Sequence, residues 1–149
     1  MAKHSPMKVL RELAEQTLND TTSQLGKVRQ AHANAVAQLE QLTSYEQEYG
    51  RQLQTTMAAT GMSVVNLLSH QFFISSLNRV VKQHTGHVAA CQQSVDQALD
   101  CWKKDKQRLN AFETLISRAD AVQQLKENRQ EQKLMDEFAQ RASLRNSGL

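Results

Sequence analysis

The sequence is poor in the residues that interrupt helices and in those that fill globular cores. It contains one proline, five glycines, four phenylalanines, two tyrosines and one tryptophan in 149 residues. Proline and glycine are the residues that helix interiors tolerate least, and Gln, Ala, Leu, Lys and Glu are abundant instead. This composition is typical of long helices and argues against a compact enzyme.

Signals for membrane insertion, secretion, metal binding and catalysis are also absent. No run of 18 apolar residues occurs, and the N-terminus lacks an apolar signal core. Cys91 and Cys101 would stand roughly 15 Å apart along one helix, too far for a disulfide within the chain. There is no glycine-rich phosphate loop, His-Glu-x-x-His or Cys-x-x-Cys motif. We expect a soluble, intracellular protein with reduced thiols, no enzymatic activity, no cofactor and no metal site.

The net charge of +3 is small and spread along the chain. The densest basic stretch is Lys103, Lys104, Lys106 and Arg108, which would surround apolar helix positions rather than form a separate face. No nucleic-acid-binding motif accompanies it, so we expect no nucleic acid among the partners. A nucleic-acid-binding rod stays open as an alternative that strongly salt-dependent affinity would reveal.

The strongest pattern that is present is a repeat in the second half of the chain. Its apolar positions alternate steps of three and four residues, and only His84 and Asp105 among them are strongly polar. They are Ile74, Leu77, Val81, His84, Val88, Cys91, Val95, Ala98, Trp102, Asp105, Leu109, Phe112, Ile116 and Ala119. A seam that repeats every 3.5 residues lets one helix face another along its length. The pattern predicts a coiled coil.

A weaker seam of the same period lies upstream. Its positions are Leu18, Thr21, Leu25, Val28, His32, Ala35, Leu39, Leu42, Glu46, Tyr49 and Leu53. Because Thr21, His32 and Glu46 are polar, we expect this helix to need the stronger one as its partner.

The segment between the two seams contains the best helix break in the chain. Gly61 can adopt a left-handed conformation at a helix end, and Ser63 can cap the next helix. We therefore predict an all-α fold, an antiparallel coiled-coil hairpin that makes a single domain over residues 1–149. Its parts are a first helix at about 6–58, a turn at about 59–63, a second helix at about 64–142 and a frayed tail at 143–149.

The predicted helices are unequal. At about 1.5 Å per residue they span roughly 78 Å and 119 Å, so the second extends beyond the first. A segment from about Ala119 to Leu144 then lacks a partner within the chain. It keeps a sparse apolar stripe made of Val122, Leu125, Met135, Phe138 and Ala142. Such a helix is marginal in water unless it packs on something, so it either frays or docks into another protein.

Several strings in this chain match a known family in order and spacing. They are Leu13-Ala14-Glu15, Tyr45 and Tyr49 around Glu48, Trp102, Lys106 to Leu109, Glu127-Asn128-Arg129, Gln132-Lys133 and Met135 to Ala142. Together they resemble the FliJ family, small coiled-coil components of the bacterial flagellar type III export apparatus. The resemblance covers nearly the whole chain.

The resemblance implies a motility-related function in flagellar protein export. Family members are similar in shape to the coiled-coil stalk of the rotary ATPase gamma subunit. They insert into the ring of the hexameric export ATPase and promote its assembly and activity. They also reach the cytoplasmic domain of the export gate and bind empty export chaperones. A member is expected in the cytoplasm, held at the inner face of the membrane by the export apparatus.

The resemblance also implies two binding surfaces. The gate-binding residues carried over from the family are Gln38, Leu42, Tyr45, Tyr49, Phe73, Leu77, Val80 and His84. The residues expected to bind the ATPase ring, in the closing motif and the unpaired stripe, are Met135, Asp136, Phe138, Arg141 and Ala142. Two alternatives stay open: the stalk of a related virulence type III secretion system, and a general structural adaptor.

Overall fold

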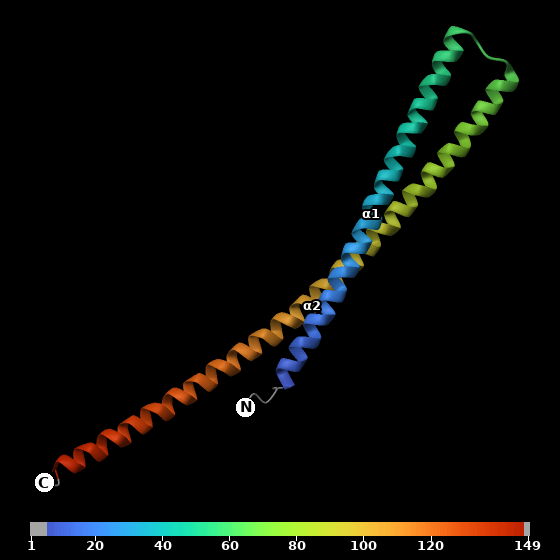
Figure 1. Ribbon diagram of the computed structural model, residues 1–149. Coiled ribbons are helices and arrows are strands. Elements are labelled where there is room, and N and C mark those ends of the chain that lie inside the picture. The colour runs from blue at the N-terminus through green and yellow to red at the C-terminus, as the bar shows by residue number, and fades with distance from the viewer. Residues whose placement is uncertain (1–5, 148–149) are drawn as a thin grey trace. The chain divides into compact units, whose positions relative to one another are not determined.

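The computed structural model describes residues 6–147, which form two α-helices (Figure 1). Helix α1 runs over Pro6–Ala59 and helix α2 over Val64–Ser147, with 54 and 84 residues. The two helices pack against each other. The predictions of an all-α fold and of a longer second helix are confirmed.

The chain leaves α1 at the predicted glycine. Gly61 has a φ of 70°, the left-handed conformation that ends many helices, and its N–H donates to the Met57 carbonyl oxygen at 3.2 Å. The Ser63 hydroxyl oxygen then accepts a hydrogen bond from the Asn66 N–H at 3.2 Å, which caps α2. Both roles agree with those expected from the sequence.

Helix α2 continues beyond the end expected from the sequence. The sequence predicts a frayed tail from residue 143, whereas α2 runs to Ser147; residues 148–149 lie outside the described residues. No proline or glycine occurs between Gly86 and Gly148 to stop it. In the last turn Arg145 places a positive charge at the negative end of the helix dipole, and the Ser147 hydroxyl donates to the Leu144 carbonyl oxygen at 3.2 Å.

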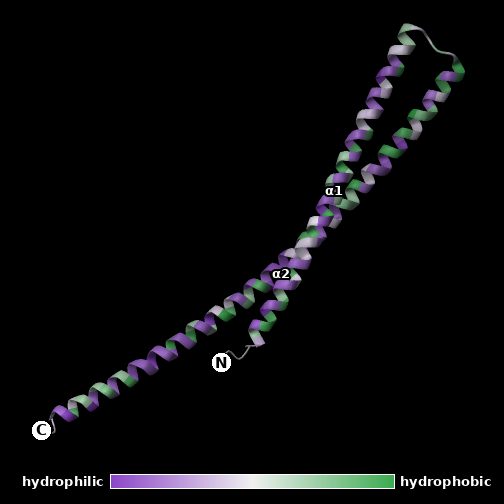
Figure 2. Cartoon of the chain, in the orientation of Figure 1, coloured by the Kyte–Doolittle hydropathy of each residue, from purple (hydrophilic) through white to green (hydrophobic). Residues whose placement is uncertain are grey.

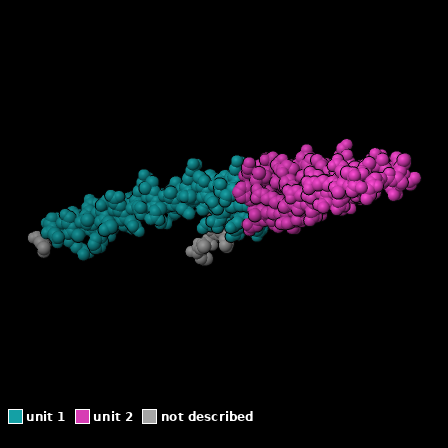
Figure 3. All heavy atoms as spheres, turned by 90° about the horizontal axis from the view of Figure 1, so that it is seen from above, with its two compact units in different colours: residues 1–18, 105–149 teal, residues 19–104 magenta. Residues whose placement is uncertain are grey.

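Contacts within the chain gather in two compact units, coloured separately in Figure 3. Unit 2 is Asn19–Lys104 and contains the loop between the helices. Unit 1 combines residues 1–18 with residues 105–149, of which the structure describes 6–18 and 105–147.

Hydrogen bonds between described residues join the two helices within unit 2. Among them are those of the Tyr49 hydroxyl with His70 Nδ1, of His84 Nε2 with the Ala35 carbonyl oxygen at 3.0 Å, and of Trp102 Nε1 with the Thr22 hydroxyl at 2.9 Å. Residue numbers rise along α2 as they fall along α1. The helices of unit 2 are therefore antiparallel.

The predicted seams form the helix interface. Every position of the upstream repeat from Leu18 to Leu53 is buried or half-buried, and so is every position of the downstream repeat from Ile74 to Ile116. Ala119, the last predicted position, is exposed because the described part of α1 begins at Pro6 and has no further turn to cover it. The core is thin, with Ala14, Leu25, Ala35, Leu77 and Leu109 as its buried apolar side chains.

Unit 1 contains a short paired region and a long unpaired one. Ala14 of α1 and Leu109 of α2 are buried, each with an exposed fraction of 5%. Met7 and Arg11 are half-buried, so together with Ala14 they extend the upstream seam by about three helical turns before Leu18, the first predicted position. In contrast, every residue from 117 to 147 is exposed.

Candidate partner-binding surfaces

The eight predicted gate-binding residues all lie in unit 2, on facing stretches of α1 and α2. The structure divides them into two groups of four. Gln38, Tyr45, Phe73 and Val80 are exposed, whereas Leu42, Tyr49, Leu77 and His84 lie in the helix interface. The four exposed residues can contact a partner directly, and the other four can act by holding them in place.

Tyr49 connects the two groups. Its hydroxyl bonds to His70 of α2, and its ring packs against Phe73 with the ring centroids 4.8 Å apart. The Phe73 side chain is 40% exposed, so its ring contacts Tyr49 on one side and remains partly open to solvent. An aromatic ring held in this way keeps its orientation when a partner binds.

His84 is also fixed across the interface. Its Nε2 atom lies 3.0 Å from the Ala35 carbonyl oxygen, which can only accept, so Nε2 carries the proton. The ring lies against that of His87, with centroids 5.5 Å apart. This polar residue interrupts an apolar seam and fixes the register of the two helices at that level.

A shallow groove of about 540 Å³ lies beside these residues. Gln38, Gln41, Leu42 and Tyr45 of α1 line it together with His84 of α2. Gln41 was not among the predicted site residues. It lies four residues, about one helical turn, before Tyr45. Because Gln41 is polar and lies outside the seam, the apolar repeat gives no indication of it.

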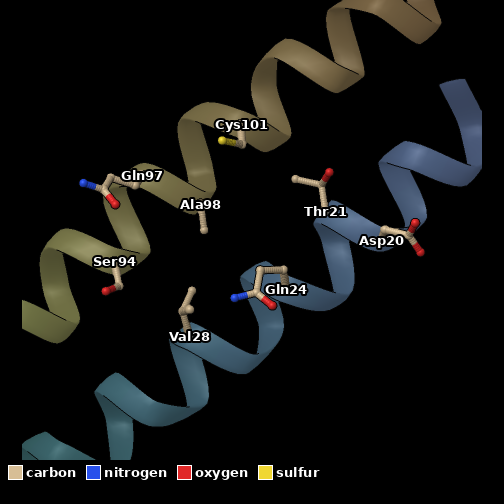
Figure 4. A pocket seen from close by; sticks show the side chains of 8 residues that line it. All are labelled: Asp20, Thr21, Gln24, Val28, Ser94, Gln97, Ala98 and Cys101. Carbon is tan, nitrogen blue, oxygen red and sulfur yellow. The ribbon is translucent and has the colours of Figure 1, made fainter.

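A second groove in unit 2, of about 600 Å³, lies where seam residues are small (Figure 4). Val28 of α1 and Ala98 of α2 point toward one another there, with Thr21 nearby. The remaining lining residues are Asp20, Gln24, Ser94, Gln97 and Cys101. Because short side chains fill the seam incompletely, this groove is a consequence of helix packing; the ionisable groups in its lining are the free thiol of Cys101 and the carboxylate of Asp20.

The residues predicted to bind the ATPase ring lie in unit 1, on the unpaired part of α2. They are Met135, Asp136, Phe138, Arg141 and Ala142, and all five are exposed. Met135 and Phe138 have exposed fractions of 73% and 75%. Met135, Phe138 and Ala142 follow one another by three and four residues, so they share one helix face. The structure thus offers an apolar stripe flanked by charges of both signs.

Within residues 6–147 no group of three or more His, Cys, Asp or Glu side chains is placed to hold a metal ion. Over the same residues neither helix is long and apolar enough to cross a membrane.

Comparison with known proteins identifies the family. The family described as "Flagellar FliJ protein" matches residues 3–148. The chain belongs to the FliJ family. It is 40% identical over 145 residues to a "Flagellar FliJ protein" of Salmonella typhi, covering 97% of this chain and 98% of the relative. A FliJ protein of Escherichia coli (strain K12) is 39% identical with the same coverage. The FliJ match includes both candidate surfaces.

Proposed function

We propose that this chain is a non-enzymatic stalk component of the bacterial flagellar export apparatus. It inserts into the ring of the hexameric export ATPase, promotes ring assembly and activity, contacts the cytoplasmic domain of the export gate and escorts export chaperones. It works in the cytoplasm, at the inner face of the membrane where the apparatus is anchored. Membership of a flagellar family supports the general assignment.

One observation carries the stalk function. Residues 117–147 form a continuous helix in which every side chain is exposed, including Leu134, Met135, Phe138 and Leu144. Large apolar side chains on an isolated helix gain little from water and much from a partner that buries them. A helix end with an open apolar stripe is suited to enter the pore of a ring.

The test is a mixture of the purified protein with its cognate export ATPase. Wild-type protein should raise ATP hydrolysis and promote hexamer formation. Phe138→Ala should raise the concentration of protein needed for both effects by about fivefold or more, since truncating a central anchor costs roughly 1–3 kcal/mol of binding. The chain itself should hydrolyse no ATP.

Phe72 provides a matched control for Phe138. The two phenylalanines have exposed fractions of 77% and 75% and lie on the same helix, but Phe72 lies in unit 2. Phe72→Ala should stimulate the ATPase like wild type. If neither substitution changes stimulation, or if wild-type protein does not stimulate at all, a structural adaptor is the better description.

The proposed gate surface consists of the exposed Gln38, Tyr45, Phe73 and Val80. The interface residues Leu42, Tyr49, Leu77 and His84 position them, because they hold the two helices in register beneath that surface. Tyr45 is the central candidate, since it is 53% exposed and lines the groove with Gln38. Exposed tyrosines are enriched among the residues that dominate protein interfaces.

A pull-down with the cytoplasmic domain of the gate tests this surface. Tyr45→Ala should reduce gate binding and leave both the melting temperature and ATPase stimulation intact. Tyr49→Ala should reduce gate binding and stability together. If Tyr45→Ala binds the gate normally, the proposed gate surface is contradicted, whereas the proposed binding of the ATPase is not affected by this result.

A further inference from the structure

The first turns of α2 present another apolar surface, which belongs neither to the proposed gate surface nor to the stripe proposed to bind the ATPase ring. Val64, Val65, Leu68 and Phe72 have exposed fractions of 72%, 73%, 59% and 77%, and we call these four residues the outer face. Much of this part of α2, next to the loop, is hydrophobic in Figure 2. It lies in unit 2.

The same turns of α2 are apolar on the opposite side as well. Leu67, His70 and Ile74 are half-buried in the interface with α1. At 100° per residue the centre of the outer face lies about 140° around the helix from the centre of this interface side. It lies about 115° from the stripe that contains Phe73 and Val80. A helix that is apolar on both sides is normally covered on both sides.

The outer face lies in a stretch without charged side chains. Residues 52–78 contain no Lys, Arg, Asp or Glu, although the chain has 18 basic and 15 acidic residues in total. An occupant therefore needs no complementary charge. Two copies of this surface can therefore meet without repulsion between like charges. Contact through other, charged parts of the chain, whose net charge is +3, would bring such repulsion.

The spacing of the outer face is complementary to itself. Val64, Leu68 and Phe72 follow one another by four residues and form one row along the helix. In an antiparallel pair with its two-fold axis at Leu68, each Phe72 ring lies against Val64 of the other copy, and the two Leu68 side chains meet. A large ring thus faces a small branched side chain at both ends of the contact. Such an arrangement is the isologous interface expected of a symmetric dimer.

We infer that the outer face is the contact of a weak homodimer, in which α2 of one copy packs antiparallel on α2 of a second copy. Four side chains per copy bury less than the roughly 800 Å² per partner of a standard stable interface. The association is therefore reversible and concentration-dependent. It leaves residues 117–147 of each copy exposed and does not rest on the proposed export function.

Sedimentation over a range from micromolar to millimolar protein tests the dimer. The average mass should rise toward twice that of one chain, equally at low and high salt because no charges meet. Phe72→Ser should keep the protein monomeric throughout that range. Phe138→Ser, the matched control with a similarly exposed ring, should dimerise like wild type.

Cysteine cross-linking tests the geometry. In a Cys91→Ala/Cys101→Ser background, Leu68→Cys should form a disulfide-linked dimer under mild oxidation, because the two-fold axis brings that position against itself. Leu134→Cys, at a site that is 65% exposed in unit 1, should cross-link far more slowly. Equal rates at the two positions would overturn the proposed arrangement.

Two further results would contradict the dimer. One is a constant monomer mass at the highest concentration. The other is monomeric protein that co-sediments with phosphatidylcholine vesicles and loses this behaviour in Phe72→Ser, which would make a lipid surface the occupant.

Discussion

Two stretches of helix α2 share one backbone conformation and differ in what surrounds them. In residues 74–116 every seam position is buried or half-buried, whereas all residues in 117–147 are exposed. The first stretch is stabilised by apolar burial against α1. The second depends on helix propensity and on local side-chain pairs such as Gln123 with Glu127 and Gln124 with Asn128. One helix thus combines a folding segment with a segment available for binding.

The largest difference between the stretches should appear when one large apolar side chain is removed from each. Leu109 is 5% exposed, so Leu109→Ala should destabilise the fold by about 2–4 kcal/mol. Phe138→Ala should leave the melting curve within error of wild type, because its ring is 75% exposed. Thermal melts followed by circular dichroism would measure both. Equal losses of stability would erase the distinction between the two stretches.

A smaller effect separates the two tyrosines of unit 2. Tyr49 bonds to His70 and packs on Phe73, so Tyr49→Phe, which removes only the hydroxyl, should cost about 1 kcal/mol. Tyr45→Phe should cost nothing measurable, since Tyr45 is exposed. Urea unfolding of the two variants compares them directly. A loss at Tyr45 as large as that at Tyr49 would place both residues in the interface.

One substitution should strengthen the paired region. Glu46 occupies a seam position, and among the described residues its Oε2 atom is buried without a hydrogen-bond partner. Replacing it by leucine removes an unsatisfied polar group and continues the apolar seam, so Glu46→Leu should stabilise the protein by about 1 kcal/mol. A rise in the urea midpoint would verify this. A fall would mean that the carboxylate has a role in the interface.

The smallest effect concerns a glycine within α2. A Cβ atom added at Gly86 meets nothing within 4 Å, so Gly86→Ala should stabilise the helix by about 0.5–1 kcal/mol. Gly61→Ala is the contrasting variant, because the φ of 70° there is strained for alanine, and it should destabilise. Melting temperatures that move in the same direction for both would contradict this account.

The sequence predicted most of the helix interface because a 3.5-residue repeat determines which side of a helix faces its partner. It located the loop through Gly61 and Ser63, and its upstream seam includes Tyr49, which lies in the interface, and omits Tyr45, which is exposed. It missed the first turns of the upstream seam. There the small Ala14 is buried, while the larger apolar Leu13 beside it is 53% exposed. The size of the apolar side chain therefore does not indicate which of the two residues faces α1.

Two other features of the structure could not be predicted from the 3.5-residue repeat. The outer face, whose most exposed residue is Phe72, went unnoticed because periodicity reports only the side that packs within the chain. The sequence pattern ends α2 too early because apolar residues become sparse after Ala142, whereas Leu144 and Arg145 still favour the helix and no glycine or proline occurs before Gly148.

Amide hydrogen exchange of α2 tests the central claim most directly. In the free protein, residues 74–116 should be protected because they are paired with α1, and residues 117–147 should exchange rapidly because only local interactions hold them. Addition of the export ATPase should protect 117–147 and leave 74–116 nearly unchanged. If 117–147 stay unprotected in the presence of the ATPase, or are already as protected as 74–116 in the free protein, α2 does not divide into a folding segment and a binding segment.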